Sequence, residues 1–339
     1  MTRRGGAAAG SDTAPGRRRR AGRVAAIAAV LLIVGGLIVF TLLPRPSGPA
    51  AAAEAYLAAL ARGDGAAAGA LTVPGAADDP VRAADALAAA AEWISAAGVD
   101  SLTERGTDAT AEVTFTLDGA QHAATLALSN ATGTWLIARP LTTQVRVHSA
   151  IGAGVTIGGA EGAAPSGGAG LVLPYDAGMT DDPTTTLALL PAVYTLAPAP
   201  AALLAGGETL AVTGGDPVTV ALVPTLRPEA RAAADAQLRA YLASCTTPTD
   251  AVPAHCGIRV PWAADLTALH ALTFRVDAEP VLALADDGRG FAATGGTLVA
   301  TARGIDDAGA EASVSYRDSD WGVRGSLRFT LDGLVLELW

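Results

Sequence analysis

The chain has 339 residues, enough for two or three domains, since one hydrophobic core usually serves on the order of 100 to 200 residues. Hydrophobic residues make up 50% of the chain but aromatic residues only 4%, so its cores must be built mostly from Leu, Val and Ala. All 23 basic residues are Arg, and the chain is rich in Ala, Gly and Pro, which indicates a source with GC-rich codons.

The Arg residues are divided unevenly along the chain. Seven precede residue 24, among them Arg17, Arg18, Arg19, Arg20 and Arg23, against one acidic residue in the same stretch. After residue 43 the remaining 16 Arg face 32 acidic residues. An acidic body repels a phosphate backbone, so the composition disfavours nucleic acid as a partner.

Residues 24–43 (VAAIAAVLLIVGGLIVFTLL) form an uncharged run of twenty residues, thirteen of them Val, Ile, Leu or Phe. As a helix this run would span roughly the 30 Å of a bilayer core. Because Arg clusters resist translocation, residues 1–23 are predicted to be a basic cytoplasmic tail, with the Arg cluster setting the topology. We therefore predict a single-pass protein of the cell membrane with its later domains outside the cytoplasm.

A cleaved secretory signal is the competing interpretation, with Ala51 to Ala53 as the cleavage zone. The apolar core of such a signal usually runs about 7 to 15 residues, and this run is longer. No Cys follows it to accept a lipid, which also favours an uncleaved anchor. Residues 44–50 (PRPSGPA) then predict a short, stiff linker.

Residues 51–142 predict helices followed by an antiparallel meander. Helical patterns cover residues 51–62, a short segment around Leu71, and a third segment capped by Asp79 that runs to about Ala97. Residues 111–117 alternate between apolar and polar, as strands do. Asp118-Gly119 predicts a tight hairpin turn, and residues 130–133 predict a second turn.

This order of elements resembles the nuclear transport factor 2-like fold, the cone-shaped family that includes SnoaL-like and ketosteroid-isomerase-like proteins. The resemblance is carried by YLAALARGD (56–64), EVTFTLDG (112–119) and GTWLIARP (133–140), and covers about 90 residues in the short form common in bacterial, actinobacterial-type, membrane-anchored envelope proteins. It implies a concave pocket into which His122 projects. A general acid/base there would need a partner such as Asp108 or Glu112.

Residues 144–225 alternate short apolar runs with Gly and Pro, which predicts a small β domain with a Gly-rich loop at residues 158–170. The passage LLPAVYTLAP (189–198) is similar to a strand in the extracellular repeats of teicoplanin-resistance-associated membrane proteins. The Gly-rich loop has no Lys and no following helix, so it is not a phosphate-binding loop.

Residues 228–339 predict a third, α+β domain. Its helix, residues 228–244, would place Ala232, Leu238 and Leu242 on one face, and six or seven alternating strands follow. Turns are predicted at residues 286–288, 306–307, 318–322 and 332–333, and Trp339 is expected to end a strand in the core. The whole chain is thus predicted to be α+β, with a transmembrane helix, a cone-like domain, a small β domain and a C-terminal antiparallel-sheet domain.

Two cysteines, Cys245 and Cys256, follow the predicted helix. Outside the cytoplasm they predict a disulfide, whose loop closure contributes about 3 kcal/mol and which pins the helix to the sheet. Two free thiols are the alternative. A metal site with His255 beside Cys256 lacks a second pair of ligands at a suitable spacing.

No catalytic motif is apparent. The four His residues form no HExxH pair, and no GxSxG segment occurs. The segment DSDWG (318–322) begins like a calcium loop but lacks the distal Glu. We therefore predict no catalytic residue, cofactor or metal.

The resulting hypothesis is a noncatalytic envelope protein that binds wall polymer or other membrane proteins, in an oligomeric state the sequence does not fix. The alternative is a small-ligand-binding protein or enzyme that uses the cone pocket of residues 51–142.

Overall fold

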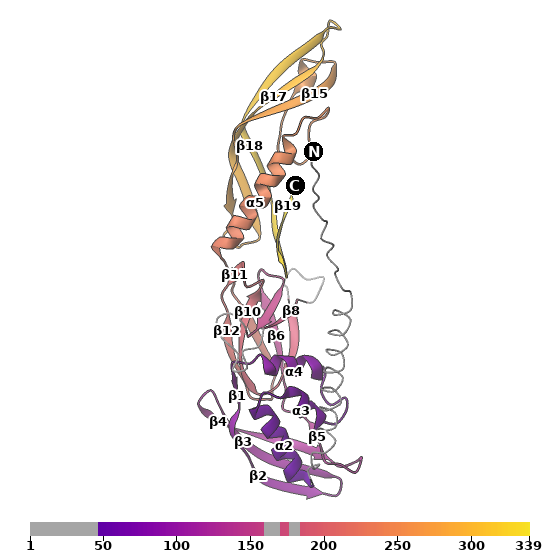
Figure 1. Cartoon of the computed structure of the whole chain (residues 1–339), viewed down its shortest axis with the longest axis vertical. Helices are drawn as coiled ribbons and strands as arrows, with labels where there is room; N and C mark the ends of the chain where they lie inside the picture. Colours follow the sequence, from indigo (N-terminus) through magenta and orange to yellow (C-terminus); the bar gives the residue numbers. More distant parts are fainter. Residues whose placement is uncertain (1–46, 159–169, 176–183) are drawn as a thin grey trace, which may run out of the picture. The chain divides into compact units, whose positions relative to one another are not determined.

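The computed structural model describes residues 47–158, 170–175 and 184–339, drawn as a ribbon in Figure 1. The fold is α+β, with mostly antiparallel sheets, and the C-terminal sheet is curled into a half-barrel. The predicted cytoplasmic tail and membrane helix lie outside the described residues, as do most of the Gly-rich loop and residues 176–183. Among the described helices, none is long and apolar enough to cross a bilayer.

Three helices and a four-stranded antiparallel sheet form the first part of the described chain. The helices are α2 (Pro49–Ala61), α3 (Gly65–Ala70) and α4 (Pro80–Ala88). The sheet has the order β2-β3-β4-β5, with bounds β2 Ser95–Arg105, β3 Asp108–Leu117, β4 Ala120–Ser129 and β5 Leu136–Arg139. The predicted hairpin turn is confirmed, because Asp118 and Gly119 join β3 to β4 with positive φ angles of 51° and 70°.

The third helix is shorter than predicted. Asp79 caps it as expected, accepting the N–H of Arg82 at 3.1 Å, but α4 ends at Ala88 instead of near Ala97. The indole of Trp93 donates to the carbonyl of Leu87 at 2.9 Å, which satisfies a carbonyl at the helix end. The chain then forms β1 (Glu92–Trp93), which pairs with β10 (Ala192–Ala199), so a distant strand overrides the helix propensity of an Ala-rich segment.

The described part of residues 143–226 contains short strands and no helix. Its strands are β6 Thr143–Ser149, β7 Gly154–Ile157, β8 Leu171–Pro174, β9 Thr184–Leu189, β10, β11 Leu204–Ala205, β12 Glu208–Val212, β13 Val218–Leu222 and β14 Thr225–Leu226. All described pairings here are antiparallel except that of β13 with β6. One core cluster contains buried residues from Ala52 to Leu222, and the backbone N–H of Leu141 donates to the buried Tyr56 hydroxyl at 3.2 Å.

Residues 228–339 build the half-barrel around one helix. The elements are α5 Pro228–Cys245, η1 Trp262–Ala264, β15 Ala268–Ala278, β16 Val281–Leu284, β17 Gly290–Ile305, β18 Glu311–Thr330 and β19 Gly333–Leu338. The strand order is β15-β17-β18-β19, and β16 also pairs with β17. The buried stripe of α5 is Ala230, Ala234, Leu238 and Leu242, spaced by four residues, whereas Ala232, expected on this face, is exposed.

Polar side chains of α5 tie the helix to both edges of this part of the sheet. Arg231 donates to the carbonyl of Leu282 in β16 at 3.0 Å. The amide of Gln237 donates to Leu334 in β19 at 2.7 Å and accepts from the N–H of Leu336 at 3.2 Å. Edge strands otherwise present unpaired backbone groups, so α5 covers the edges while its apolar stripe fills the concave side of the sheet.

Five strands follow α5 instead of the six or seven predicted, because two predicted strands belong to the single long strand β18. The segment 318–322, predicted as a turn, lies inside that strand. Opposite it, β17 carries register shifts on both sides of Gly296, which pairs with Trp321. These bulges let the long hairpin bend sharply without ending either strand.

Candidate functional site

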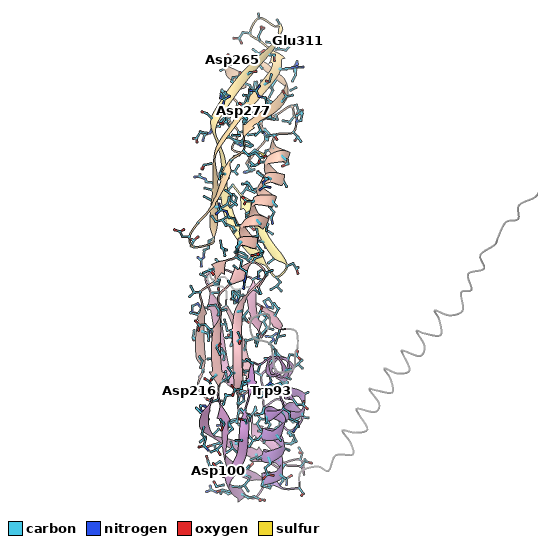
Figure 2. The ribbon with its side chains drawn as sticks, turned by 60° about the vertical axis from the view of Figure 1, so that its left-hand side comes forward. Trp93, Asp100, Asp216, Asp265, Asp277 and Glu311 are labelled. Carbon is cyan, nitrogen blue, oxygen red and sulfur yellow. A yellow bond between two sulfur atoms is a disulfide. The ribbon has the colours of Figure 1, made fainter. Side chains whose placement is uncertain are left out.

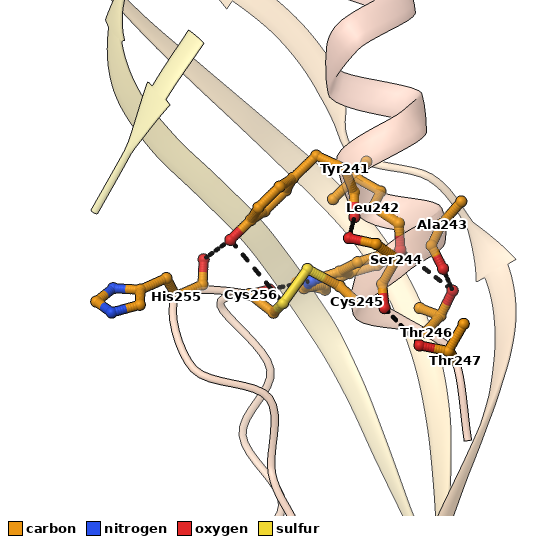
Figure 3. Close-up of a disulfide and its surroundings, with 10 residues drawn as sticks. Tyr241, Leu242, Ala243, Ser244, Cys245, Thr246, Thr247, His255 and Cys256 are labelled. Atoms are coloured by element: carbon orange, nitrogen blue, oxygen red, sulfur yellow. Dashed lines mark hydrogen bonds between the residues drawn. A yellow bond between two sulfur atoms is a disulfide. The ribbon is translucent and has the colours of Figure 1, made fainter. Parts of the chain in front are cut away.

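A disulfide joins the last residue of α5 to the loop that follows the helix (Figure 3). Cys245 and Cys256 are joined with their Cα atoms 5.6 Å apart, so the predicted bond is confirmed and the free-thiol alternative is wrong. A metal site that uses Cys256 is thereby ruled out as well. Across the described ranges, no group of three or more His, Cys, Asp or Glu side chains is placed to hold a metal ion.

The loop around Cys256 is fixed at three successive residues, at one to α5 and at two to β18. The hydroxyl of Tyr241 donates to the carbonyl of His255 at 2.9 Å, and the buried indole of Trp321 donates to the carbonyl of Cys256 at 2.8 Å. Gly257 has a φ of +63°, and a Cβ there would collide with the carbonyl oxygen of Gly322. The loop therefore approaches β18 at a distance that only glycine permits.

His255 itself adopts a backbone conformation that non-glycine residues rarely take, with a φ of +60°. The surrounding contacts hold it there, since the disulfide fixes the neighbouring Cys256 and the Tyr241 hydroxyl donates to the carbonyl of His255 itself. Figure 3 shows its imidazole ring pointing away from Tyr241 and from the disulfide. In this backbone conformation the His255 ring lies on the outside of the loop.

The outward side of the loop and the outer face of the sheet line an open cavity of about 530 Å³. Small residues form part of its lining: Gly257, Ala292 and Gly322. Apart from Val323, the larger side chains around it are polar or aromatic. We call this cavity the Trp339 groove, and its other lining residues are His255, Arg259, Ala293, Thr294, Asp318, Asp320, Val323, Arg324 and Trp339.

Strand register explains why Trp339 lies on the outer face. Gly325 pairs with Leu338, and the N–H of Trp339 donates to the carbonyl of Arg324 at 3.3 Å, so these two residues lie opposite each other across β18 and β19. Alternation along β19 buries Leu334 and Leu336 and turns Val335, Glu337 and Trp339 outward. Trp339 is 62% exposed, so its predicted place in the core is wrong.

Several charged side chains of the Trp339 groove lack a partner among the described residues. No hydrogen bond or ion pair joins the side chains of Arg259, Arg324 or Asp320 to another described residue, while Asp318 accepts the backbone N–H of Asp320 at 3.0 Å. Beyond the groove, on the same outer face, Arg328 is paired with Glu337 at 2.5 Å. The groove therefore concentrates hydrogen-bonding groups that are free to meet a ligand.

Two acidic residues near the long-strand half of the sheet, by contrast, are engaged within the protein. Figure 2 labels Asp265 and Asp277 there. Asp265 accepts the hydroxyl of Tyr316 at 2.7 Å, and Asp277 pairs with Arg275 at 3.0 Å and with Arg317 at 2.7 Å. These acids have structural roles, which leaves the Trp339 groove as the stronger candidate site.

The pairing of Asp277 leads to a testable titration. Hydrogen bonds from Arg275 and then from Arg317 lower the pKa of Asp277 below its ordinary value of 3.8. We expect an NMR titration of the carboxyl carbon to show this lowered pKa, and expect Arg317→Ala to raise it. A depressed carboxylate stabilises the fold above its ordinary pKa and loses that effect as the pH falls through the lowered pKa. A transition at the ordinary value would contradict the pairing.

The cone-pocket residues named from the sequence are not brought together. His122 lies opposite Phe115 on the inner face of the sheet, with ring centroids 5.8 Å apart. Asp108 and Glu112 alternate onto the exposed face, where Glu112 accepts the hydroxyl of Thr125 at 3.0 Å. The two carboxyl groups suggested as partners therefore cannot form an acid/base pair with His122 across the sheet.

Comparison with known proteins gives no relative for this chain: no family model, no curated protein and no solved structure matches it. The resemblance to the nuclear transport factor 2-like family and the likeness to teicoplanin-resistance-associated proteins stay predictions. The predicted topology residues, Arg17 to Arg20 and Arg23, lie outside the described residues. The assignment of the candidate site therefore depends only on the positions and contacts of its residues.

Proposed function

We propose that this protein is a single-pass, membrane-anchored envelope protein that binds wall polymer outside the cytoplasm without catalysing a reaction. The observation that carries the proposal is the Trp339 groove, whose free charged groups and exposed indole are held in place by a disulfide-fixed loop. Structural disulfides persist in oxidising compartments, which supports an extracytoplasmic location. The apolar run of residues 24–43 and its Arg-rich flank supply the anchor in this proposal.

In this proposal the N-terminal part of the described chain, residues 51–142, is a short nuclear transport factor 2-like domain followed by the β domain of residues 144–225. Its three helices packed on an antiparallel sheet support that assignment. The inner face of the sheet is lined with buried side chains such as Tyr56, Phe115, Leu126 and Ile137. These two segments would serve as the folded connection between the anchor and the binding region, residues 228–339.

The alternative, a small-ligand carrier or enzyme that uses the cone pocket, has less support. It needs at least two convergent polar groups in that pocket, and the carboxyl groups of Asp108 and Glu112 lie on the opposite face from His122. In the Trp339 groove, the imidazole of His255 has no carboxylate hydrogen-bonded to it among the described residues, so no general-base pair supports catalysis there.

The topology in this proposal is tested with an epitope tag placed after Trp339. We expect protease added to intact cells to digest this tag, because the Arg-rich flank of residues 24–43 keeps only the N-terminus in the cytoplasm. The same tag placed before residue 3 serves as the matched control and should remain protected until the cells are lysed. Protection of the tag after Trp339 in intact cells would remove the envelope location from the proposal.

The binding role is tested separately, by crosslinking in the native membrane. A photoreactive residue in place of Thr294, which lines the Trp339 groove, should capture wall polymer, and the same residue at Thr125 on the first sheet should not. Capture at both positions, or at neither, would contradict a binding role for the groove.

A further inference from the structure

We infer that the Trp339 groove is a saccharide site that prefers sugars carrying a carboxylate. This inference rests on the proposed function and specifies the chemistry of its ligand. It follows from three features that converge on one cavity: an exposed indole, two guanidinium groups with no partner among the described residues, and acceptor side chains placed over a lining of small residues.

The indole of Trp339 provides the stacking surface. It is 62% exposed and stands on the outer face of a sheet whose register fixes its position opposite Arg324. An exposed Trp costs little conformational entropy when it binds and offers a large flat apolar area with one N–H donor. The C–H face of a pyranose ring is a planar apolar surface of matching kind, so a sugar ring can stack on this indole while its hydroxyl groups stay free to hydrogen bond.

The two arginines supply the preference for negative charge. A guanidinium presents a planar set of donors that pairs with both oxygens of a carboxylate, and such charge-assisted hydrogen bonds are roughly twice as strong as neutral ones. Arg259 enters the groove from the segment just after Cys256 and Arg324 from β18, and neither is paired with a described residue. Two guanidinium groups without a described partner around one groove therefore form a ready set of donors for a carboxylate.

The remaining polar groups match sugar hydroxyls. Asp320 has no described partner, Asp318 keeps one carboxylate oxygen beyond the bond that its Oδ1 accepts, and the His255 ring points outward. Carboxylate and imidazole side chains accept hydrogen bonds from neutral hydroxyl groups. The small lining residues leave room for a ring, and about 530 Å³ falls within the roughly 300 to 1,000 Å³ typical of small-ligand sites.

Other ligand classes fit the groove less well. A docked peptide needs either a free strand edge or apolar pockets for its side chains. Here the loop of residues 255–257 lies against β18, and the lining combines small residues with charged ones. A nucleic acid would meet an acidic protein body, because acidic residues outnumber Arg by two to one after residue 43.

Two matched probes test the inference on the full-length protein in detergent micelles by isothermal titration calorimetry. One is a peptide-free tetrasaccharide of alternating N-acetylglucosamine and N-acetylmuramic acid, and the other is the neutral tetramer of N-acetylglucosamine. They share ring type and N-acetyl groups but differ in the lactyl carboxylates. We expect the acidic tetrasaccharide to bind at least about tenfold more tightly, and the preference to shrink as salt rises.

Substitutions then show which residues cause the preference for the acidic tetrasaccharide. Arg324→Gln and Arg259→Gln should each reduce or remove the preference for the acidic probe over the neutral probe. Trp339→Ala should weaken both probes at least about tenfold, and Trp339→Tyr should restore most of that loss because it keeps an aromatic surface. Arg328→Gln is the matched control, since Arg328 lies on the outer face of the same strand, is paired with Glu337, and does not line the groove.

The inference is overturned if the two probes bind equally, or if Arg328→Gln changes the preference as much as Arg324→Gln does. It is also overturned if neither saccharide binds, or if the stem peptide of the wall polymer binds while both saccharides do not. These results are distinguishable from failure of the proposed function, which is decided by the position of the tag after Trp339 and by crosslinking in the membrane.

Discussion

Replacing Trp321 with Ala should lower the free energy of unfolding by about 3 to 5 kcal/mol, the range for removing a large buried aromatic side chain. Trp321 is fully buried, and its indole N–H is the donor that satisfies the carbonyl of Cys256. The substitution therefore opens a cavity in the half-barrel core and also leaves a buried carbonyl without its partner. Urea unfolding followed by circular dichroism measures the loss.

Two further variants separate the causes of this loss. Trp321→Phe keeps most of the packing but removes the donor, so it should lose only about 1 to 3 kcal/mol. Trp339→Ala is the matched control, because that Trp is largely exposed, and its effect on stability should stay within about 0.5 kcal/mol. Equal losses at Trp321 and Trp339 would show that the assignment of one to the core and the other to the surface is wrong.

The β3–β4 hairpin and the segment around Trp321 differ in how far the sequence predicts them. Local alternation was sufficient for the hairpin of β3 and β4, since the apolar positions from Ala111 to Leu117 and the Asp118-Gly119 turn depend only on nearby residues. The segment around Trp321 was not predictable in the same way. Its Asp and Gly residues are typical of a turn, and only the bulges at Gly296, on the facing strand, keep β18 continuous.

A similar non-local effect determined the end of α4. The Ala-rich stretch after Ala88 has the composition of a helix, and nothing nearby in the sequence stops it before Gly98. Pairing of Glu92 and Trp93 with β10, about 100 residues further along the chain, ends the helix instead. Sequence periodicity reflects only propensity and local pattern, so it does not reveal a strand partner about 100 residues away.

The candidate site was predictable only in part for the same reason. Two cysteines in a chain predicted to lie outside the cytoplasm were enough to predict the disulfide. The Trp339 groove draws its lining from four separate segments, 255–259, 292–294, 318–324 and 339, which meet only once the strand register is fixed. The one local signal was the alternation of β19, which places Trp339 outward with Val335 and Glu337.

Removing the disulfide by Cys245→Ala together with Cys256→Ala should destabilise the protein by about 3 kcal/mol, because the bond closes a short loop and restricts the unfolded chain. It should also weaken binding of the acidic tetrasaccharide at least about tenfold. The strained φ of His255 and the close approach of Gly257 to Gly322 both depend on a fixed loop, and Arg259 follows directly. Without the bond this loop has less to hold it in place.

Urea unfolding and calorimetric titration at a temperature where the variant remains folded measure the two effects separately. Reducing agent should bring the wild-type protein close to the double variant in both measurements and should leave the double variant unchanged, which controls for effects of the reductant elsewhere. A variant that loses stability but binds the tetrasaccharide as tightly as the wild type would show that the loop keeps its conformation without the bond. In that case Tyr241 and Trp321, through their hydrogen bonds to His255 and Cys256, would be sufficient to present Arg259 to the groove.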